Sequence, residues 1–138
     1  MTFDEFRIAY LDDLNLPSVK GQLFDIYGYK PAGVATFLNE LNEIKEQVVN
    51  VLVTRICTPL VGGMSKKRCH KAERSKEGLW QLTTDGGARF LYFQDSQRRL
   101  IVVSATGKMK EKKFHTEIAT ADKRKVEYLK LIKEKVSK

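Results

Sequence analysis

Residues 79–106 read LWQLTTDGGARFLYFQDSQRRLIVVSAT, in which three apolar and aromatic runs are separated by two short polar segments. The runs have the length and the branched and aromatic composition of strands, which predicts strands over Leu79–Thr84, Ala88–Gln94 and Arg99–Thr106. Asp85-Gly86-Gly87 and residues 95–98 are typical of tight turns, so we expect the three strands to form an antiparallel meander.

A long helix is expected after this meander. Thr116 is a suitable N-cap with Glu117 in the first turn, and apolar residues continue at helical spacing to Val136. The side chains expected on the buried face are Ile118, Ala121, Leu129 and Ile132.

The region before the meander is expected to supply one strand and a helical hairpin. Gly21–Tyr29 has the composition and length of a strand. One helix is predicted over Pro31–Leu41 and a second from Glu43 to the stop at Pro59, although the break at Asn42 is weak and a single long helix is the alternative. Residues 65–76 are basic without a periodic apolar face, which predicts a loop.

The predicted elements give a single α+β domain over residues 1–138. Residues 2–14 have apolar side chains at helical spacing and end at Pro17, so residues 1–18 are expected to be a short helical extension packed on the outside. We expect the helices to lie against one side of a small twisted sheet and to leave its other side available.

The net charge of +8 is unevenly distributed along the chain. Residues 1–60 hold 5 Lys and Arg against 8 Asp and Glu, whereas residues 61–138 hold 20 against 9. Because clustered like charges repel, this excess favours a surface that binds nucleic acid, or else an acidic protein segment.

No apolar run reaches the length of about 20 residues that a membrane-spanning helix needs, and the first residues are acidic. We therefore expect a cytoplasmic protein with no membrane partner, in which Cys57 and Cys69 are reduced thiols.

Three motifs occur in a fixed order in the second half of the chain. They are Gly78-Leu79-Trp80-Gln81-Leu82, Arg89-Phe90-Leu91-Tyr92-Phe93 and a lysine-rich segment over residues 107–121 that leads into the last helix. Their order and spacing, together with the order of elements over roughly residues 20–130, resemble the RelE/ParE superfamily of bacterial and phage toxins, most closely its HigB-like, phage-derived branch.

This resemblance implies a RelE-like fold and the toxin of a type II toxin–antitoxin system. Such toxins are endoribonucleases (mRNA interferases) that usually cleave mRNA on the translating ribosome, using basic residues on an open sheet face. The implied partners are a cognate antitoxin, mRNA and the ribosome, and no cofactor or metal is expected. Cleavage without a metal requires a base for the ribose 2′-hydroxyl, a cation for the phosphorane and an acid for the leaving oxygen.

The resemblance implies catalytic roles for Arg89, His70, Lys108 and Tyr92. Arg89 matches a strand arginine that contacts the scissile phosphate in related toxins, and pairing with Asp85 or Asp95 is the structural alternative. His70 lies ten residues before Trp80, the offset of an active-site histidine in some HigB-type toxins, and the alternative is a solvated loop histidine.

His70 or Lys108 is the predicted proton-transfer group. Tyr92 is implied by the family motif and also fits a core position with a bonded hydroxyl. For His115, packing or capping is the favoured role. The side chains predicted to bind RNA phosphates are Lys67, Arg68, Lys71, Lys110, Lys112 and Lys113, with simple solvation as the alternative. If the segment after the last strand is extended, Lys108, Lys110 and Lys112 share one side.

Trp80 and Phe93 are expected in the core, where such aromatic residues usually lie. Gly86-Gly87 lacks the context of a phosphate loop, and Cys69-His70 lacks the other ligands of a zinc site. If the protein is not a nuclease, the alternative function is that of a non-catalytic nucleic-acid-binding protein, or of a gyrase-directed ParE-like toxin or regulator of the same fold.

Overall fold

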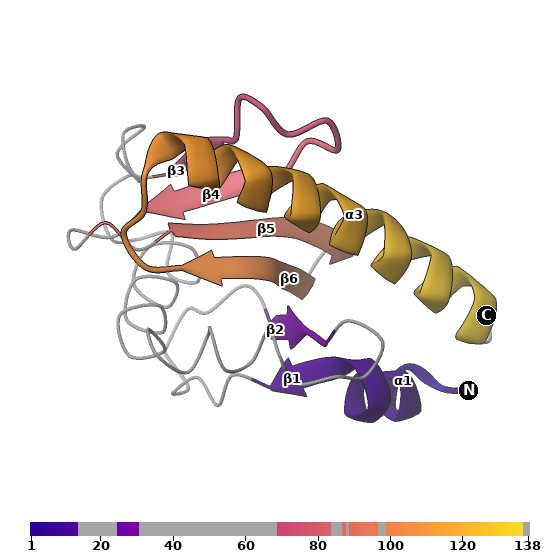
Figure 1. Cartoon of the computed structure of the whole chain (residues 1–138). Helices are drawn as coiled ribbons and strands as arrows, with labels where there is room; N and C mark the ends of the chain where they lie inside the picture. The colour runs from indigo at the N-terminus through magenta and orange to yellow at the C-terminus, as the bar shows by residue number, and fades with distance from the viewer. Residues whose placement is uncertain (14–24, 31–68, 84–86, 88, 97–98, 137–138) are drawn as a thin grey trace.

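The computed structural model describes residues 1–13, 25–30, 69–83, 87, 89–96 and 99–136. Within these ranges it has mixed α and β structure, with six strands in one sheet and the order β1-β2-β6-β5-β4-β3 (Figure 1). The elements are α1 (Phe3–Tyr10), β1 (Leu11–Asp13), β2 (Asp25–Tyr29), β3 (Cys69–Lys71), β4 (Trp80–Thr83), β5 (Arg89–Ser96), β6 (Arg99–Thr106) and α3 (Glu111–Lys135).

The predicted meander is confirmed. Strand β4 pairs antiparallel with β5, and β5 pairs antiparallel with β6, so that Trp80 lies opposite Tyr92 and Tyr92 opposite Val102. Strand β2 falls within the predicted strand Gly21–Tyr29 and pairs in parallel with β6, with Asp25 opposite Arg99. The helical hairpin expected over residues 31–58 and the thiol of Cys57 lie outside the described residues.

Two edge strands were not predicted. Strand β1 occupies the end of the expected N-terminal helix and pairs with β2, while β3 occupies part of the expected basic loop and pairs with β4. The prediction that residues 65–76 form a loop is therefore wrong at Cys69–Lys71. Both strands are three residues long, too short for a periodic pattern, so their pairing with a neighbouring strand determines their structure.

Helix α1 lies within the predicted N-terminal helical extension and contributes one buried side chain, Phe6, to the core. Its start is fixed by a capping box in which Thr2 and Glu5 bond each other's backbone amides, and the amide of Thr2 lowers the pKa of Glu5. Phe6 is fully buried, and its ring lies 5.8 Å from that of Tyr128 on α3. The aromatic contact joins α1 to the middle of the molecule.

Helix α3 begins five residues before the predicted cap, Thr116. Lys110 occupies the N-cap position without a side-chain hydrogen bond, and the hydroxyl of Thr116 donates to the carbonyl of Lys112 inside the helix. Ile118 and Ala121 are buried as predicted and Ile132 is partly buried, but Leu129 is 40% exposed. Tyr128 occupies the buried position in its place, because the face against the sheet runs through positions 114, 118, 121 and 128.

Helix α3 lies across one face of the sheet (Figure 1). The side chains of Leu91, Phe93 and Ile101 on that face join Phe114 and Ile118 of α3 in one apolar cluster. The described helices are thus on one side, as expected.

The opposite face of the sheet is buried over its central strands. Alternate residues of a strand point to opposite faces. The buried residues turned away from α3 are Ile26, Leu82, Phe90, Tyr92, Leu100 and Val102, each at most 6% exposed. At the edge formed by β4 and β3 the same face is open, because Trp80, opposite Tyr92, is 39% exposed and Lys71 beside it is exposed. The expectation of an open sheet face carrying the basic residues is therefore wrong for β2, β5 and β6.

No helix among the described residues is long and apolar enough to cross a membrane.

Candidate functional site

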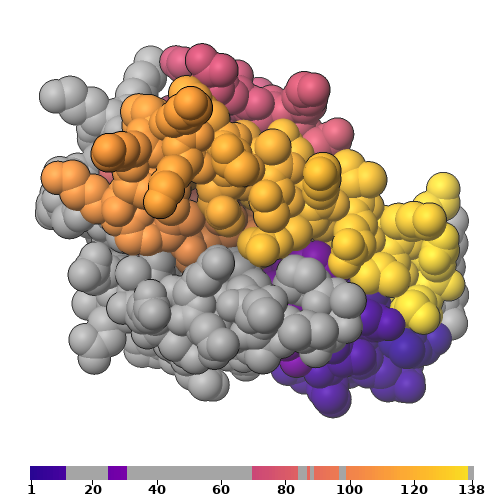
Figure 2. All heavy atoms as spheres, in the orientation of Figure 1, coloured from indigo at the N-terminus to yellow at the C-terminus, as the bar shows by residue number. Residues whose placement is uncertain are grey.

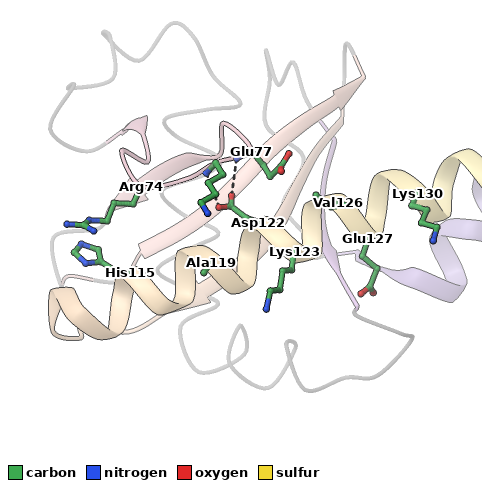
Figure 3. A pocket seen from close by; sticks show the side chains of 10 residues that line it. Arg74, Glu77, His115, Ala119, Asp122, Lys123, Val126, Glu127 and Lys130 are labelled. Carbon is green, nitrogen blue, oxygen red and sulfur yellow. Dashed lines mark hydrogen bonds between the residues drawn. The ribbon is translucent and has the colours of Figure 1, made fainter.

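Two connected depressions lie between α3 and the segment that links β3 to β4. The smaller, which we call the histidine hollow, has a volume of about 270 Å³ and is lined by His70, Glu73, Arg74, Gln81, Glu111, Phe114, His115 and Ile118. The larger, the α3 groove, has about 530 Å³ and is lined by Arg74, Lys76, Glu77, His115, Ala119, Asp122, Lys123, Val126, Glu127 and Lys130 (Figure 3). Figure 2 shows α3 and the segment after β3 next to each other on one face of the molecule.

One buried carboxylate holds the wall of both depressions in place. Asp122 on α3 is 8% exposed and accepts hydrogen bonds from the Ser75 hydroxyl at 2.6 Å, from the Lys76 amide at 2.9 Å and from the Glu77 amide at 3.4 Å. The Ser75 oxygen in turn accepts from the Leu79 amide at 2.9 Å. The turn next to Arg74 is therefore fixed to α3 through the Ser75 hydroxyl and the backbone amides of Lys76 and Glu77.

Glycine is required at one point of this turn. Gly78 has a φ of +73°, in the left-handed region that residues with a side chain rarely adopt. Lys125 of α3 donates to the carbonyl of Glu77 beside it, at 2.6 Å. The chain thus reverses direction between β3 and β4 within residues 72–79.

His70 projects from the edge strand β3 into the histidine hollow. Its Nδ1 lies 2.9 Å from the carbonyl oxygen of Lys71. Because a carbonyl oxygen only accepts, this contact requires the hydrogen on Nδ1 and leaves Nε2 as the nitrogen that can accept a proton. His70 is thus held in a strand and is not the solvated loop residue of the alternative interpretation.

His115 reaches the same hollow from α3. Its Nε2 lies 3.6 Å from Oε2 of Glu111, one helical turn earlier, which is beyond hydrogen-bond distance but suits an ion pair when the ring is protonated. His115 and Arg74 line both depressions and lie beside each other where these meet (Figure 3). The predicted capping role is wrong, because His115 lies in the second turn of α3 and the N-cap is Lys110; its side chain is 35% exposed.

Arg89 points toward α3. Its guanidinium lies 2.7 Å from Oε1 of Glu111 and 4.3 Å from the ring centroid of Phe114, and its side chain is 18% exposed. The expected structural partner Asp95 is instead bound to Arg99 at 3.0 Å, and Asp85 lies outside the described residues. Since Glu111 and Phe114 line the histidine hollow, Arg89 lies directly behind one of its walls.

The other two predicted catalytic residues do not line the hollow. Tyr92 turns to the opposite sheet face from Arg89 and is 6% exposed, because strand alternation separates positions 89 and 92. Lys108 follows β6, and its side chain approaches Gly87, where an added Cβ would lie 3.1 Å from Cγ of Lys108.

The predicted lysine row is not a single extended segment. Lys108 and Lys110 precede α3, whereas Lys112 and Lys113 lie in its first turn, so the strand-like alternation expected for Lys108, Lys110 and Lys112 is wrong. These four lysines are exposed at the end of α3 that also carries Glu111 and His115.

Of the predicted RNA-binding residues in the basic segment, Lys67 and Arg68 lie outside the described residues. Lys71 is exposed on β3, with its Nζ 6.0 Å from the ring of Trp80. Trp80 is 39% exposed and not in the core as predicted, because its neighbour β3 is a short edge strand that leaves it uncovered. Phe93 is 3% exposed, so its predicted core position is confirmed.

Four residues of the hollow were not singled out from the sequence, namely Glu73, Arg74, Glu111 and Phe114, and Gln81 was named only as a member of the Gly78–Leu82 motif. The spacing of Glu111 and His115 is the i, i+4 spacing of a helix, which would have placed them on one face had the start of α3 been recognised. Arg74 was counted among the basic residues, but only the contacts of Asp122 determine its position.

The hollow combines two imidazoles, one exposed guanidinium and two carboxylates. No group of three or more His, Cys, Asp or Glu in the described part of the chain is arranged to hold a metal ion. The chemistry that the arrangement can perform is proton transfer by His70 and His115 on an anion bound by Arg74.

No protein-family model, curated protein or solved structure matches this chain.

Proposed function

We propose that this protein is an endoribonuclease that cleaves mRNA by attack of the ribose 2′-hydroxyl on the adjacent phosphate. The observation that carries the proposal is that His70 and His115, which are 45 positions apart in the chain, line one hollow together with Arg74. Two proton-transfer groups and a cation are what this reaction requires.

The biological role that we propose is that of a RelE/ParE superfamily toxin of the HigB-like branch, held in check by an antitoxin and acting on the ribosome. The sequence motifs support this role. The order of the described elements, with β2 before the meander β4-β5-β6 and α3 after it, agrees with the order that the resemblance implies.

In the proposed mechanism His70 is the base. Its Nε2 accepts the proton of the 2′-hydroxyl, since Nδ1 is held by the carbonyl of Lys71. The deprotonated oxygen attacks phosphorus and forms a pentavalent phosphorane. Strand β3 restricts the position of the His70 backbone, which favours a fixed approach of the ring to the ribose.

His115 is the proposed acid. When its ring is protonated, Glu111 is its ion-pair partner, and Nε2 donates its proton to the leaving 5′-oxygen. The products are a 2′,3′-cyclic phosphate and a 5′-hydroxyl. His115 stands on the wall of the hollow formed by α3, which separates the acid from the base on β3.

Arg74 and Arg89 are the proposed cations for the phosphorane. Arg74 is exposed in the hollow, whereas Arg89 reaches the substrate only if a phosphate oxygen takes the place of the Glu111 carboxylate. A positioned cation at a developing oxyanion contributes about 3–4 kcal/mol to transition-state stabilisation. Lys71, Lys108, Lys110, Lys112 and Lys113 surround this end of the molecule and are proposed to bind neighbouring phosphates.

The proposal is tested by inducible expression of the chain in bacteria, with mRNA 5′ ends mapped before and after induction. The expected result is growth arrest with new 5′ ends in coding sequences. A His70→Ala/His115→Ala double variant, expressed to the same level, should leave the mRNA intact. Damaged DNA with intact mRNA would support the gyrase-directed alternative, and unchanged growth with intact mRNA would leave only a binding protein.

A further inference from the structure

The α3 groove adjoins the histidine hollow, because Arg74 and His115 line both. Building on the proposed function, we propose that this groove binds the nucleotides that flank the cleaved bond. The substrate is then a single RNA strand that extends from His70 along α3 to Lys130.

The groove follows one stripe of α3. Its helical wall includes His115, Ala119, Val126 and Lys130, whose spacings of four and seven residues keep them on one side of the helix. At 1.5 Å of rise per residue, the 15 residues from His115 to Lys130 span about 22 Å. A depression of this length is suited to a chain of several nucleotides and exceeds what one nucleotide fills.

The rim of the groove carries four cations. Arg74 and Lys76 come from the turn, and Lys123 and Lys130 come from α3, so both long sides present a positive charge. All four are exposed. Two lysines separated by seven residues, or two helical turns, can contact two different phosphates of one strand.

The carboxylates of the groove are mostly bound within the protein. Asp122 accepts its hydrogen bonds from the turn, and Glu127 accepts one from the hydroxyl of Tyr29. The third acidic residue that lines the groove is Glu77, whose carboxylate accepts no hydrogen bond from the described residues. The charges presented to a ligand are therefore mainly those of the lysines and Arg74.

Two apolar side chains line the groove between the cations. Ala119 is exposed and Val126 is 49% exposed. Apolar side chains favour contact with the faces of sugars and bases, and a base face is accessible in a single strand but not in a stacked duplex. Continuity with the hollow favours RNA over an acidic protein segment as the occupant.

The test measures binding without cleavage. The probes are fluorescein-labelled 2′-O-methyl oligouridylates of two and of eight nucleotides, which cannot be cleaved because the attacking hydroxyl is blocked. Their affinity is measured by anisotropy over a salt series for wild type, Lys123→Ala, Lys130→Ala and the control Lys133→Ala. Lys133 is an exposed lysine of α3 that does not line the groove.

For the eight-nucleotide probe, Lys123→Ala and Lys130→Ala should each reduce the slope of log affinity against log salt by about 0.7, which corresponds to about fourfold weaker binding at 0.15 M salt. Lys133→Ala should bind like wild type, and no variant should change binding of the dinucleotide. The proposal is overturned if the two groove variants match Lys133→Ala, or if they weaken the dinucleotide equally.

Cleavage of the all-ribose probe separates this inference from the proposed function. Groove-dependent binding without cleavage, either of the free probe or of mRNA on programmed ribosomes, would reject the nuclease chemistry and keep the groove as an RNA site. If kcat/KM is equal for the dinucleotide and the eight-nucleotide RNA, the protein is a nuclease but the α3 groove does not bind the flanking nucleotides.

Discussion

The carboxylate of Asp122 is predicted to fix both the stability of the fold and the geometry of the hollow. The substitution Asp122→Asn keeps the volume of the side chain but replaces one acceptor oxygen with an NH₂ group. In either orientation of the amide that group then faces a backbone N–H donor, the Lys76 amide on one side or the Glu77 amide on the other, whereas the Ser75 hydroxyl can turn to accept from it.

The expected loss of stability follows from these contacts. A hydrogen bond to a charged group contributes about 1.5–3 kcal/mol net, and the variant removes the charge from all three bonds and places an NH₂ group against one of the two backbone amides. Asp122 is 8% exposed, so water replaces little of what is lost. We expect the free energy of unfolding to fall by about 2–3 kcal/mol, with a Tm lower by about 8 °C.

The assay is urea unfolding of the purified chain, combined with hydrogen exchange of the Lys76 and Glu77 amides. Both amides donate to Asp122, so their exchange should accelerate in the variant more than that of amides in β5. The matched control is Glu134→Gln, which makes the same chemical change at an exposed position of α3. It should stay within about 0.5 kcal/mol of wild type.

The consequence for the site is a misplaced Arg74, which directly precedes the anchored turn. Under conditions where Asp122→Asn is still folded, cleavage of RNA should be slower than in Glu134→Gln. If Asp122→Asn is as stable as this control and its Lys76 and Glu77 amides exchange at the wild-type rate, then Asp122 does not hold the turn and the description of the wall is wrong.

Three further predictions concern the chemistry and the core. His115→Ala should slow single-turnover cleavage by about 10²–10⁴ with little change in RNA affinity; a change in affinity alone would remove its role as acid. Arg89→Ala should lower the cleavage rate by two to three powers of ten, roughly 3–4 kcal/mol, and a lower Tm at unchanged activity would show that its contact with Glu111 is only structural. Burial and the hydrogen bond to Asp95 raise the pKa of Tyr128, so the neutral phenol stabilises the fold below pH about 10 and this stability is lost as the pH rises above that value. Tyr128→Phe, measured by urea unfolding from neutral to alkaline pH, should be less stable at neutral pH and should show a smaller alkaline decline.

The elements that the sequence predicts correctly are those with long, regular patterns. The three strands between residues 79 and 106 have apolar runs bounded by turn residues, and they form the predicted meander. The strands β1 and β3 were missed because each has only three residues, whose conformation is set by the neighbouring strand and not by local composition. Leu129 was placed on the buried face because it is apolar and lies at helical spacing from Ile118, whereas Tyr128 is the residue that is buried near this end of α3.

The candidate site was only partly predictable. His70 was singled out from its offset to Trp80, but its neighbour across the hollow, His115, was assigned to packing because the start of α3 was placed at Thr116. Arg89 was recognised as unusual within an apolar strand, yet its direction depends on which sheet face meets α3. The role of Asp122 depends on contacts between positions 46 and 47 residues apart, which no local pattern reveals.

The most direct test of the proposed chemistry is the identity of the RNA ends that the purified chain produces. A defined mRNA would be incubated with the chain, either free or on programmed ribosomes, and the terminal groups of the products would be analysed. For the free RNA the reaction would be run both with and without a metal chelator. We predict a 2′,3′-cyclic phosphate and a 5′-hydroxyl, unaffected by the chelator, with no cut where the attacking 2′-hydroxyl is replaced by hydrogen. Products with a 3′-hydroxyl and a 5′-phosphate, or cleavage by His70→Ala/His115→Ala at the wild-type rate, would contradict it.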